Sequence, residues 1–353
     1  MRTILFLIGL SLFFVNEANS KNTILFLGDG MGITTVTAAR IYEGQLNGLD
    51  GESNSLSFES FDNVAFVKTY SADAQIPDSA GTMSAIMTGQ KTRSGVISVG
   101  PKYARGDCQS VIKDSRETLV EIAERAGLKT GVISTSRITD ATPAATFSHS
   151  PDRKWENDGE MPQSSGAEKC TDIASQLVSF DYGDGIDLVL GGGRSNFFPD
   201  TDKDMEYPDR FGSRTDGRNL VEEWLGQGVN RRYVWNNSQF MVVNTNSQIL
   251  GLFEQQEMNY EVERASGIGQ EPSLQEMTEY AVNFLSKGEK GFFLVIEGAR
   301  IDHANHNKEP FLALSDTIEF SSAVRKALEL VDLEETLILV TADHSSSLAF
   351  SGY

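Results

Sequence analysis

The sequence predicts an α/β fold, a three-layer αβα sandwich built around a central, mostly parallel sheet. The first observation is that short, wholly apolar runs alternate along the chain with longer segments of helical spacing. Strands that are buried on both faces of a parallel sheet have this continuous apolar pattern. The second observation is that 353 residues with 39% hydrophobic content can bury a large core, which a sheet covered by helices on both faces requires.

The elements of the first half of the chain follow in order. The pattern predicts strands at residues 23–27, 64–70 and 130–135, and helices at residues 33–45, 80–88 and 118–126. The last two helices end next to Gly89 and Gly127. Glycine is common just past a helix end because it adopts the left-handed backbone of a C-cap without strain. These two helix ends are therefore well defined by sequence.

The second half continues the alternation after a different kind of segment. The pattern predicts strands at residues 188–190, 292–296 and 337–341, and helices at residues 173–180, 276–285 and 310–331. Residues 197–272 are polar, rich in Asp, Asn and Gly, and weakly periodic. We expect this stretch to be an insertion packed on the main sheet and not a separate domain. Residues 21–353 are therefore expected to form one domain.

Residues 1–20 have the composition of a secretory signal peptide. Arg2 supplies the basic end, residues 4–15 are almost wholly apolar, and Ala18-Asn19-Ser20 is a small-x-small cleavage site. The alternative is a first core strand, but residues 23–27 already fill that role. No other stretch reaches the roughly 18 apolar residues of a membrane helix. We therefore expect an exported protein, secreted or on the extracellular face of the cell surface.

Export would allow the two cysteines to form a disulfide and one asparagine to be glycosylated. Cys108 and Cys170 would form one disulfide in an oxidising compartment, worth roughly 4 kcal/mol in the chain-entropy model. The alternative is two buried free thiols. Asn236-Asn237-Ser238 is a glycosylation sequon at Asn236.

The net charge of −20 restricts the partners of the protein. A nucleic acid would be repelled, so nucleic-acid binding is excluded as a function class. An anionic substrate would also be repelled unless the site concentrated positive charge. Bound cations can supply that charge.

Three of the four histidines lie in two short segments near the end of the chain. Glu297, Asp302 and His306 follow one apolar run, and Asp343 and His344 follow the next. Ligands of parallel sheets bind beyond the carboxyl ends of the strands. Carboxylates and imidazoles without thiolates suit a hydrolytic Zn²⁺ or Mg²⁺ centre better than a structural zinc site. The alternative is a polar loop, but two such segments at one edge indicate a centre with more than one metal.

Two further residues are candidates for the same edge. Asp29 follows the first strand within Gly28-Asp29-Gly30-Met31-Gly32, and Ser79 lies where a loop enters a helix of small residues. A helix N-terminus favours bound anions, and a metal could hold a serine hydroxyl deprotonated there. The alternative for both residues is an ordinary helix cap, which accounts for Asp29 equally well. From the local sequence alone, the cap is the simpler interpretation of Ser79.

Taken together, these segments resemble the alkaline phosphatase family, in particular the animal-type and related secreted enzymes. The matching segments are FLGDGMG (residues 26–32), PDSAGT (77–82), DATPAA (140–145), RKW (153–155), EGARIDH (297–303) and TADH (341–344). They occur in the order of the family and extend over nearly the whole chain after residue 20.

The resemblance implies hydrolysis of phosphomonoesters through a phosphoserine intermediate. It implies that Ser79 is the serine phosphorylated during turnover and that Arg153 grips the phosphoryl oxygens. It also implies two zinc ions and one magnesium ion. Their implied ligands are Asp29, Asp343 and His344 for the second zinc, Asp302 and His306 for the first zinc, and Asp29, Thr142 and Glu297 for magnesium. Recognition centred on the phosphoryl group implies small phosphomonoester substrates that are loosely selected.

The sequence departs from the family pattern at several positions. The first zinc of the family has a third ligand, a histidine well beyond residues 341–344, whereas this chain stops at Tyr353. We therefore expect a chain that lacks the closing part of the domain and has an incomplete first zinc site. Asp140 and His303, which flank the centre, resemble the bacterial and the animal residue respectively. The remaining histidine, His149, resembles a framework position.

The animal enzymes also bind calcium. Glu206, Phe253 and Glu254 resemble three of the calcium ligands, while Ala265 stands where a further carboxylate is expected. The alternative is a charged surface of the insertion. Members of the family are commonly homodimers, which we expect here too. Some are attached to membranes by a lipid anchor, whose signal would lie in the absent tail.

Two other functions remain open at this stage. One is a related phosphodiesterase or sulfatase that uses the same metals. The other is a secreted metal- or phosphate-binding protein without catalysis.

Overall fold

Seven strands form one sheet in the computed structural model, which describes residues 21–162, 170–243 and 246–351. The order across the sheet is β4-β5-β3-β2-β6-β1-β7, and every pair of neighbours is parallel. The strands are β1 (Asn22–Gly28), β2 (Lys129–Arg137), β3 (Leu188–Gly192), β4 (Arg231–Val234), β5 (Gln248–Leu252), β6 (Phe292–Gly298) and β7 (Thr336–Ala342). The predicted parallel sheet is confirmed.

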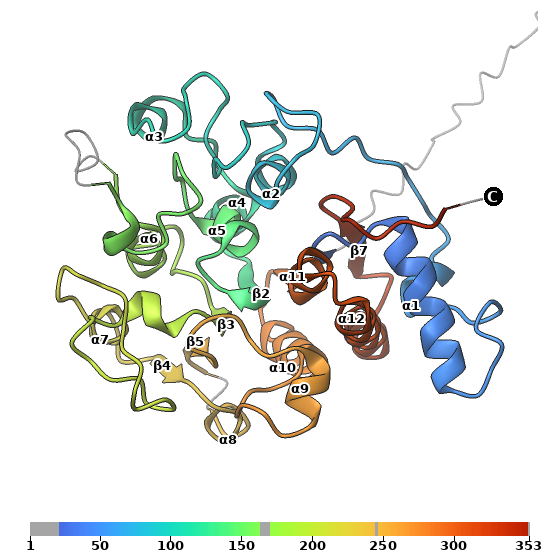
Figure 1. Ribbon diagram of the computed structural model, residues 1–353. Helices are drawn as coiled ribbons and strands as arrows, with labels where there is room; N and C mark the ends of the chain where they lie inside the picture. The colour runs from blue at the N-terminus through green and yellow to red at the C-terminus, as the bar shows by residue number, and fades with distance from the viewer. Residues whose placement is uncertain (1–20, 163–169, 244–245, 352–353) are drawn as a thin grey trace, which may run out of the picture.

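Helices cover both faces of the sheet, which Figure 1 shows with its strands end-on. One face has α2 (Ser79–Thr88), α3 (Gln109–Asp114), α4 (Leu119–Ala126), α5 (Ala141–Phe147), α6 (Ile173–Val178) and α7 (Leu220–Gly226). The other has α1 (Ile33–Leu46), α8 (Asn237–Phe240), α9 (Glu261–Ala265), α10 (Leu274–Leu285), α11 (Arg300–Asn307) and α12 (Pro310–Leu330). Short 3-10 helices are η1 (Ser57–Ser60), η2 (Asp158–Glu160) and η4 (Arg194–Phe197). The predicted three-layer architecture is confirmed.

A hydrophobic core lies on each face of the sheet, and both cores are built from the apolar runs of the strands. Along β1, Ile24 and Phe26 belong to the core under α10 and α12, whereas Leu25 and Leu27 belong to the core on the opposite face. Because successive side chains of a strand point to opposite faces, a strand buried on both sides needs an unbroken apolar run.

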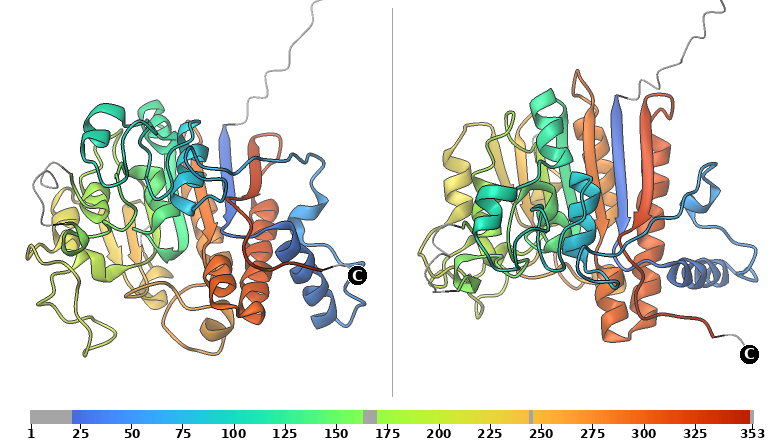
Figure 2. Two further views of the ribbon diagram at one scale, coloured as in Figure 1. Left: turned by 45° about the horizontal axis from the view of Figure 1, so that its top comes forward. Right: turned by 90° about the horizontal axis from the view of Figure 1, so that it is seen from above.

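The position of β1 decides where the site forms. β1 lies between β6 and β7, with Gly28 level with Gly298 on one side and with Ala342 on the other. The loops that follow these three strands therefore start side by side. In Figure 2, β1, β6 and β7 run next to one another through the sheet.

The prediction of a strand at residues 64–70 is wrong. The segment is irregular and lies outside the sheet. Val64 and Phe66 are 92% and 93% exposed. β1, the preceding strand in the sequence, already has a neighbour on each side, so the segment cannot pair with it, and a strand without a partner leaves its backbone groups unpaired.

The polar stretch at residues 197–272 contributes more to the sheet than the sequence predicted. It contains β4 and β5, which extend the sheet beyond β3, so this part belongs to the sheet and is not only packed on it. β4 is an edge strand of four residues that begins with Arg231 and Arg232. A short, charged edge strand lacks the apolar run that identifies buried strands.

Other predictions have different outcomes. The disulfide between Cys108 and Cys170 is present.

The side chain of Asn236 is buried and accepts a hydrogen bond from the backbone N–H of Gln239. This bond caps α8. The fold thus offers little access to this sequon, and glycosylation remains a prediction. The signal peptide at residues 1–20 lies outside the described residues. Within the described residues, no helix is long and apolar enough to cross a membrane.

His149 has a structural position away from the candidate site. Its Nε2 is 2.8 Å from Oε1 of Glu121 on α4, and its Nδ1 is 2.9 Å from the backbone oxygen of Ser98. Burial lowers the pKa of His149, but the hydrogen bond and the charge of Glu121 outweigh burial, so the pKa lies above the ordinary value of 6.5. A protonated His149 therefore stabilises the folded state.

We expect His149→Gln to reduce the free energy of unfolding in a pH-dependent way. Because the pKa is raised in the folded state, the stabilisation is fully present below about pH 6.5 and is lost as the pH rises through the folded pKa. The difference from wild type should be about 1 kcal/mol at low pH and smaller at high pH. Urea unfolding with chelator present, at about pH 6 and about pH 9, measures it. An equal or larger difference at the higher pH would contradict this assignment.

Candidate active site

The carboxyl ends of β1 and β7 bring together three candidate metal ligands. Asp29 follows β1, and Asp343 and His344 follow β7. Nε2 of His344 lies 3.2 Å from Oδ2 of Asp343 and 3.6 Å from Oδ1 of Asp29. One ligand atom of each residue lies within 4.8 Å of the others. Asp29 is more than 300 positions from Asp343 and His344 in the sequence, and it meets them only because β1 and β7 are neighbours.

Ser79 completes this group from the other side. It is the first residue of α2, and Asp78 before it caps the helix by accepting from the N–H of Gly81. Oγ of Ser79 lies 3.2 Å from Oδ2 of Asp29 and 3.4 Å from Nε2 of His344. Ser79 is thus not the helix cap that the local sequence favoured. Its hydroxyl stands between two candidate ligands, at a helix end whose free N–H groups attract anions.

Asp302 and His306 form a second, adjoining pair on α11. Their side chains meet at 3.1 Å, between Oδ2 of Asp302 and Nε2 of His306. The carboxylate of Asp302 is in close contact with Gly30, where an added Cβ would overlap it. The left-handed backbone of Gly30 and its missing side chain therefore let this pair approach the loop that holds Asp29. Oδ1 of Asp302 is buried and has no hydrogen-bond partner among the described residues.

The electrostatics of this group favour bound cations. Burial raises the pKa of Asp29 well above its usual range, and the charges of Asp343, Asp302 and Glu297 raise it further. Several carboxylates this close cannot all be ionised in a buried site without positive charge between them. A divalent cation supplies that charge and lets all of them ionise.

Glu297 lies at the end of β6 and is fully buried. Burial raises its pKa to about 8, although the hydroxyl of Ser134 donates a hydrogen bond of 2.5 Å to Oε2 and acts in the opposite direction. The hydroxyl of Thr142 is near enough to Glu297 to lower the pKa of Glu297 as well. This hydroxyl is buried and makes no well-formed hydrogen bond to any described residue. A buried, unsatisfied hydroxyl beside a carboxylate fits an oxygen-rich magnesium site.

Arg153 lies between two carboxylates beside the serine. Its Nη1 is 3.2 Å from Asp78 and its Nη2 is 3.1 Å from Asp140. Burial alone would raise the pKa of Asp140, but His303, whose Nε2 is 3.8 Å from Oδ2 of Asp140, and the charges of Arg153 and Arg137 hold it well below its usual range. The guanidinium is therefore held in one orientation by Asp78 and Asp140, on either side.

The calcium candidates lie together but are paired with protein groups. Glu206 accepts from Arg194 at 2.8 Å, and Glu254 accepts from the hydroxyl of Tyr207 at 2.7 Å. Glu271 lies beside them and was not predicted; its Oε2 is buried without a partner among the described residues. Burial raises the pKa of Glu271 to about 8, and the charges of Glu254 and Glu206 contribute. Glu271 thus offers the additional carboxylate that Ala265 does not.

Two residues that support the site were also missed. Thr82, three residues after Ser79 on the same side of α2, donates to Oδ2 of Asp343 at 3.0 Å. Ser134 on β2 donates to Glu297, as described above. The spacing of Thr82 and the presence of a serine within a buried strand were the only signals available, and both are common in proteins for other reasons.

A parallel sheet with serine, carboxylates and histidine at its carboxyl edge fits a metal-dependent hydrolase with an α/β fold. A sequence profile of the alkaline phosphatase family matches residues 20–353. The alkaline phosphatase of Gadus morhua is 40% identical over 352 residues, covering 98% of this chain and 73% of that protein. The tissue-nonspecific isozyme of Gallus gallus is 41% identical, covering 96% of this chain and 66% of that protein. The chain belongs to the alkaline phosphatase family.

Solved structures agree with this assignment. The alkaline phosphatase of Thermus thermophilus superposes with a TM-score of 0.74 at 26% identity, covering 93% of this chain and 60% of that one. The enzyme of the Antarctic bacterium TAB5 gives a TM-score of 0.71 at 25% identity, covering 93% of this chain and 80% of that one. A mutant of the TAB5 enzyme has been solved with Mg bound in its M3 site. The chain spans about two thirds of the length of the Gadus morhua and Gallus gallus relatives.

Proposed function

We propose that this protein hydrolyses phosphomonoesters with Ser79 as the nucleophile, releasing inorganic phosphate and an alcohol. One observation supports the proposal above the others. The hydroxyl of Ser79 lies at a helix N-terminus, 3.2 Å from Asp29 and 3.4 Å from His344. A nucleophile, candidate metal ligands and anion-attracting N–H groups thus converge on one point.

The donor set fits one zinc ion and one magnesium ion, and it supplies two ligands of a second zinc site. Asp29, Asp343 and His344 would hold one zinc, and Asp302 and His306 would contribute to the other. Glu297 and Thr142, with Asp29, would hold magnesium. The unsatisfied oxygens of Asp302 and Thr142 support these assignments, because buried polar atoms in native proteins seldom lack a partner. When bound, such cations lower the pKa of a coordinated hydroxyl or water and neutralise charge on phosphoryl oxygens.

The residues of the chain then act in two steps. In the first, Oγ of Ser79 forms a bond to phosphorus, the ester P–O bond breaks, and the alcohol leaves with a proton. In the second, a water oxygen bonds to phosphorus and the P–Oγ bond breaks, which releases phosphate and returns the serine. Arg153 binds phosphoryl oxygens through its planar fork of donors and orients the group. The transfer depends mainly on positioning and charge stabilisation.

Arg153→Lys tests the role of the fork. Lysine keeps the charge but loses paired donation, so we expect kcat/KM for a small monoester to fall about 10- to 100-fold. Steady-state kinetics measure the change. Arg125→Lys is the matched control, because Arg125 forms an exposed ion pair with Glu117 near the end of α4 that precedes β2, away from the candidate site. Equal losses in both variants would reject a specific role for Arg153.

The reaction class is tested with three esters. With zinc and magnesium supplied, we expect the chain to cleave an aryl phosphate monoester faster than the matching diester or sulfate ester, and a chelator to stop the reaction. Faster cleavage of the diester or the sulfate ester would favour the related phosphodiesterase or sulfatase. Zinc binding without cleavage of any ester would favour the non-catalytic binding protein.

We also propose a calcium site formed by Glu206, Glu254 and Glu271, with the backbone carbonyl of Phe253. Ca²⁺ prefers oxygen ligands. Besides burial, the charges of Glu254 and Glu206 raise the pKa of Glu271, so the three carboxylates lie close together. We expect calcium to raise the thermal unfolding midpoint of the wild type and to have a much smaller effect on Glu271→Gln. Scanning calorimetry with the zinc and magnesium concentrations held constant measures this. An equal calcium effect on both proteins would reject the site.

The cellular location of the protein is inferred from its disulfide and from one relative. A disulfide is typical of secreted and cell-surface proteins, and the relative from Bombyx mori is described as membrane-bound. We propose that this protein is secreted or lies on the extracellular face of the cell. The homodimer remains a prediction, and sedimentation of the purified protein tests it.

A further inference from the structure

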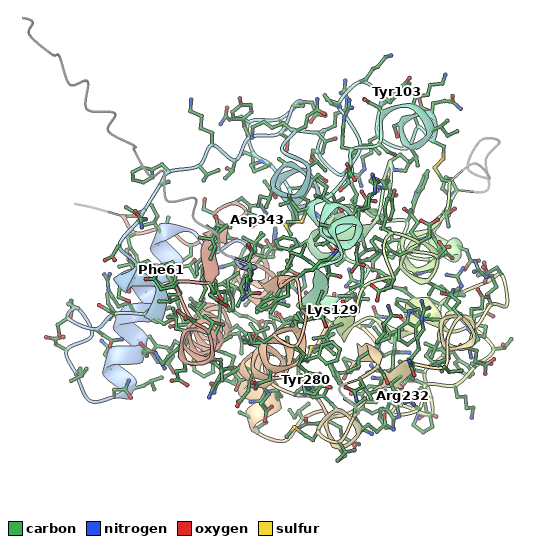
Figure 3. The ribbon with its side chains drawn as sticks, turned by 180° about the vertical axis from the view of Figure 1, so that it is seen from behind. Phe61, Tyr103, Lys129, Arg232, Tyr280 and Asp343 are labelled. Atoms are coloured by element: carbon green, nitrogen blue, oxygen red, sulfur yellow. A yellow bond between two sulfur atoms is a disulfide. The ribbon has the colours of Figure 1, made fainter. Side chains whose placement is uncertain are left out.

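Arg300 and His303 lie one turn apart on α11, beside the candidate active site. Nη1 of Arg300 lies 3.0 Å from Nδ1 of His303, and Nε2 of the same imidazole lies 3.8 Å from Oδ2 of Asp140. Asp140 in turn pairs with Nη2 of Arg153 at 3.1 Å. Figure 3 labels Asp343, which marks the position of the candidate active site among the surrounding side chains. His303 thus stands between Arg300 and the carboxylate that pairs with Arg153.

The contact between Arg300 and His303 defines which imidazole nitrogen carries the proton. A guanidinium has N–H donors and no acceptor. Nδ1 of His303 must therefore accept from Nη1 of Arg300, and the proton of the neutral imidazole lies on Nε2. Nε2 is the nitrogen on the side of Asp140. His303 thus presents an N–H group, and not a lone pair, to this carboxylate.

Arg300 is held in the position that this contact requires. Its backbone N–H donates to the hydroxyl of Thr135 on β2 at 3.2 Å. Its guanidinium lies 3.7 Å from the ring centre of Tyr260, which is 5% exposed. An aromatic face attracts a cation, and it does so more strongly where water is excluded. Within the described part of the chain, the guanidinium is therefore held by the ring of Tyr260 and by Nδ1 of His303.

The direction of the Nε2–H group matters because Asp140 holds Arg153. Oδ1 of Asp140 accepts from Arg153 and from the backbone N–H of Ala141, and Oδ2 accepts from the hydroxyl of Ser136 at 2.9 Å. At 3.8 Å, the N–H of His303 is too far from Oδ2 for a direct hydrogen bond, but it still acts on the carboxylate electrostatically. An N–H group attracts a carboxylate, whereas a nitrogen lone pair repels it. The other tautomer of the imidazole would therefore weaken the hold of Asp140 on Arg153.

We propose that Arg300 is a positioning residue that acts on Arg153 through His303 and Asp140. It fixes the Nε2–H form of His303, which keeps the carboxylate of Asp140 where it orients the guanidinium of Arg153. This role rests on the proposed binding of phosphoryl oxygens by Arg153. Arg300 thus contributes to phosphoryl binding without contacting the phosphoryl group.

The tautomer of His303 is measured first, in the wild type. The chain has four histidines, so in the metal-loaded protein labelled with 15N-histidine the signals of His303 are identified by their loss in His303→Ala. Long-range 1H–15N spectra at about pH 9, above the ordinary titration range of histidine, should show the proton on Nε2. A proton on Nδ1 would overturn the proposal. This measurement needs no variant of Arg300 and no turnover.

The affinity for inorganic phosphate is measured next, by isothermal titration of the metal-loaded protein. Arg300→Met keeps a contact with Tyr260 but loses the donor, so the dissociation constant should rise about fivefold. Arg300→Lys keeps a donor and should change it less than about twofold. Arg264→Met is the matched control, because Arg264 is a partly buried arginine on α9 that pairs with Glu261. Equal weakening in Arg264→Met and Arg300→Met would contradict the proposal.

Two further comparisons separate positioning from a general structural role. Loss of phosphoryl binding raises KM for a small monoester and leaves kcat little changed, whereas a smaller folded fraction lowers kcat at constant KM. We expect the first pattern in Arg300→Met. In a His303→Ala background, Arg300→Met should change the phosphate dissociation constant less than about twofold, because the residue through which it acts is missing.

The proposal is overturned if Arg300→Met lowers kcat at an unchanged KM, or if it weakens phosphate binding as much in the His303→Ala background as in the wild type. The spectra and the phosphate titrations need no turnover. A failure of the proposed catalysis is therefore distinguishable from a failure of the role of Arg300.

Discussion

Ser79→Ala is expected to abolish phosphomonoester hydrolysis while leaving the fold and metal binding unchanged. The hydroxyl is the only protein group that bonds to phosphorus in the proposed mechanism, and removal of a catalytic nucleophile lowers kcat by factors of about 10⁴ or more. Zinc content should not change, because Asp29, Asp343 and His344 remain in place. Stopped assays with an aryl phosphate and elemental analysis of the purified protein measure the two effects.

Ser84→Ala is the matched control for this experiment. Ser84 lies on the same helix, is fully buried, and bonds to the backbone of Val96 and Ser98. Its loss should reduce the free energy of unfolding by about 1 kcal/mol with little effect on kcat. Substantial turnover by Ser79→Ala, or an equal loss in Ser84→Ala, would remove Ser79 from the mechanism.

Asp343→Asn is expected to change activity and metal-free stability in opposite directions. Asp343 is 1% exposed and accepts hydrogen bonds from the N–H of Gly30 and the hydroxyl of Thr82. Asparagine has nearly the same shape, so the geometry should persist while one charge disappears. Since even a residue that only supports a metal ligand contributes about 10–100-fold to affinity or activity, loss of a direct ligand should lower kcat/KM more than about 100-fold.

Without metal ions, the Asp343→Asn variant should be more stable than the wild type. The charge of Asp343 raises the pKa of Asp29, second only to burial, so its removal relieves repulsion in the folded state. We expect the free energy of unfolding with chelator present to rise by about 1 kcal/mol. Urea unfolding and zinc titration measure the two effects, with the exposed Asp50→Asn as a control. Lower stability of metal-free Asp343→Asn would show that Asp343 is a structural residue and not a ligand.

Local sequence predicted individual elements well where burial is complete. β6 (Phe292–Gly298) is buried along its whole length and has an unbroken apolar run. The C-cap glycines of α2 and α4 adopt the expected left-handed backbone. Prediction failed where burial is partial. β4 was missed because an edge strand needs few apolar residues. Residues 64–70 begin with an apolar run like that of a strand but have no pairing partner.

The candidate site was predicted in part. The residue types and their places after apolar runs indicated metal ligands at the carboxyl edge, and the resemblance to a family assigned a role to each. The supporting contacts of Ser134 and Thr82 could not be predicted, because a serine or threonine in a buried element usually bonds to its own backbone.

By itself, the sequence determined which segments are strands and helices and which kinds of ligand follow them, because apolar periodicity and residue chemistry are local properties. Only the tertiary structure decided that β1 lies between β6 and β7. Pairing of strands distant in sequence depends on how the helices pack on both faces, and no local pattern records it. That order places Asp29 beside Asp343 and His344, and it brings Ser79 into contact with both loops.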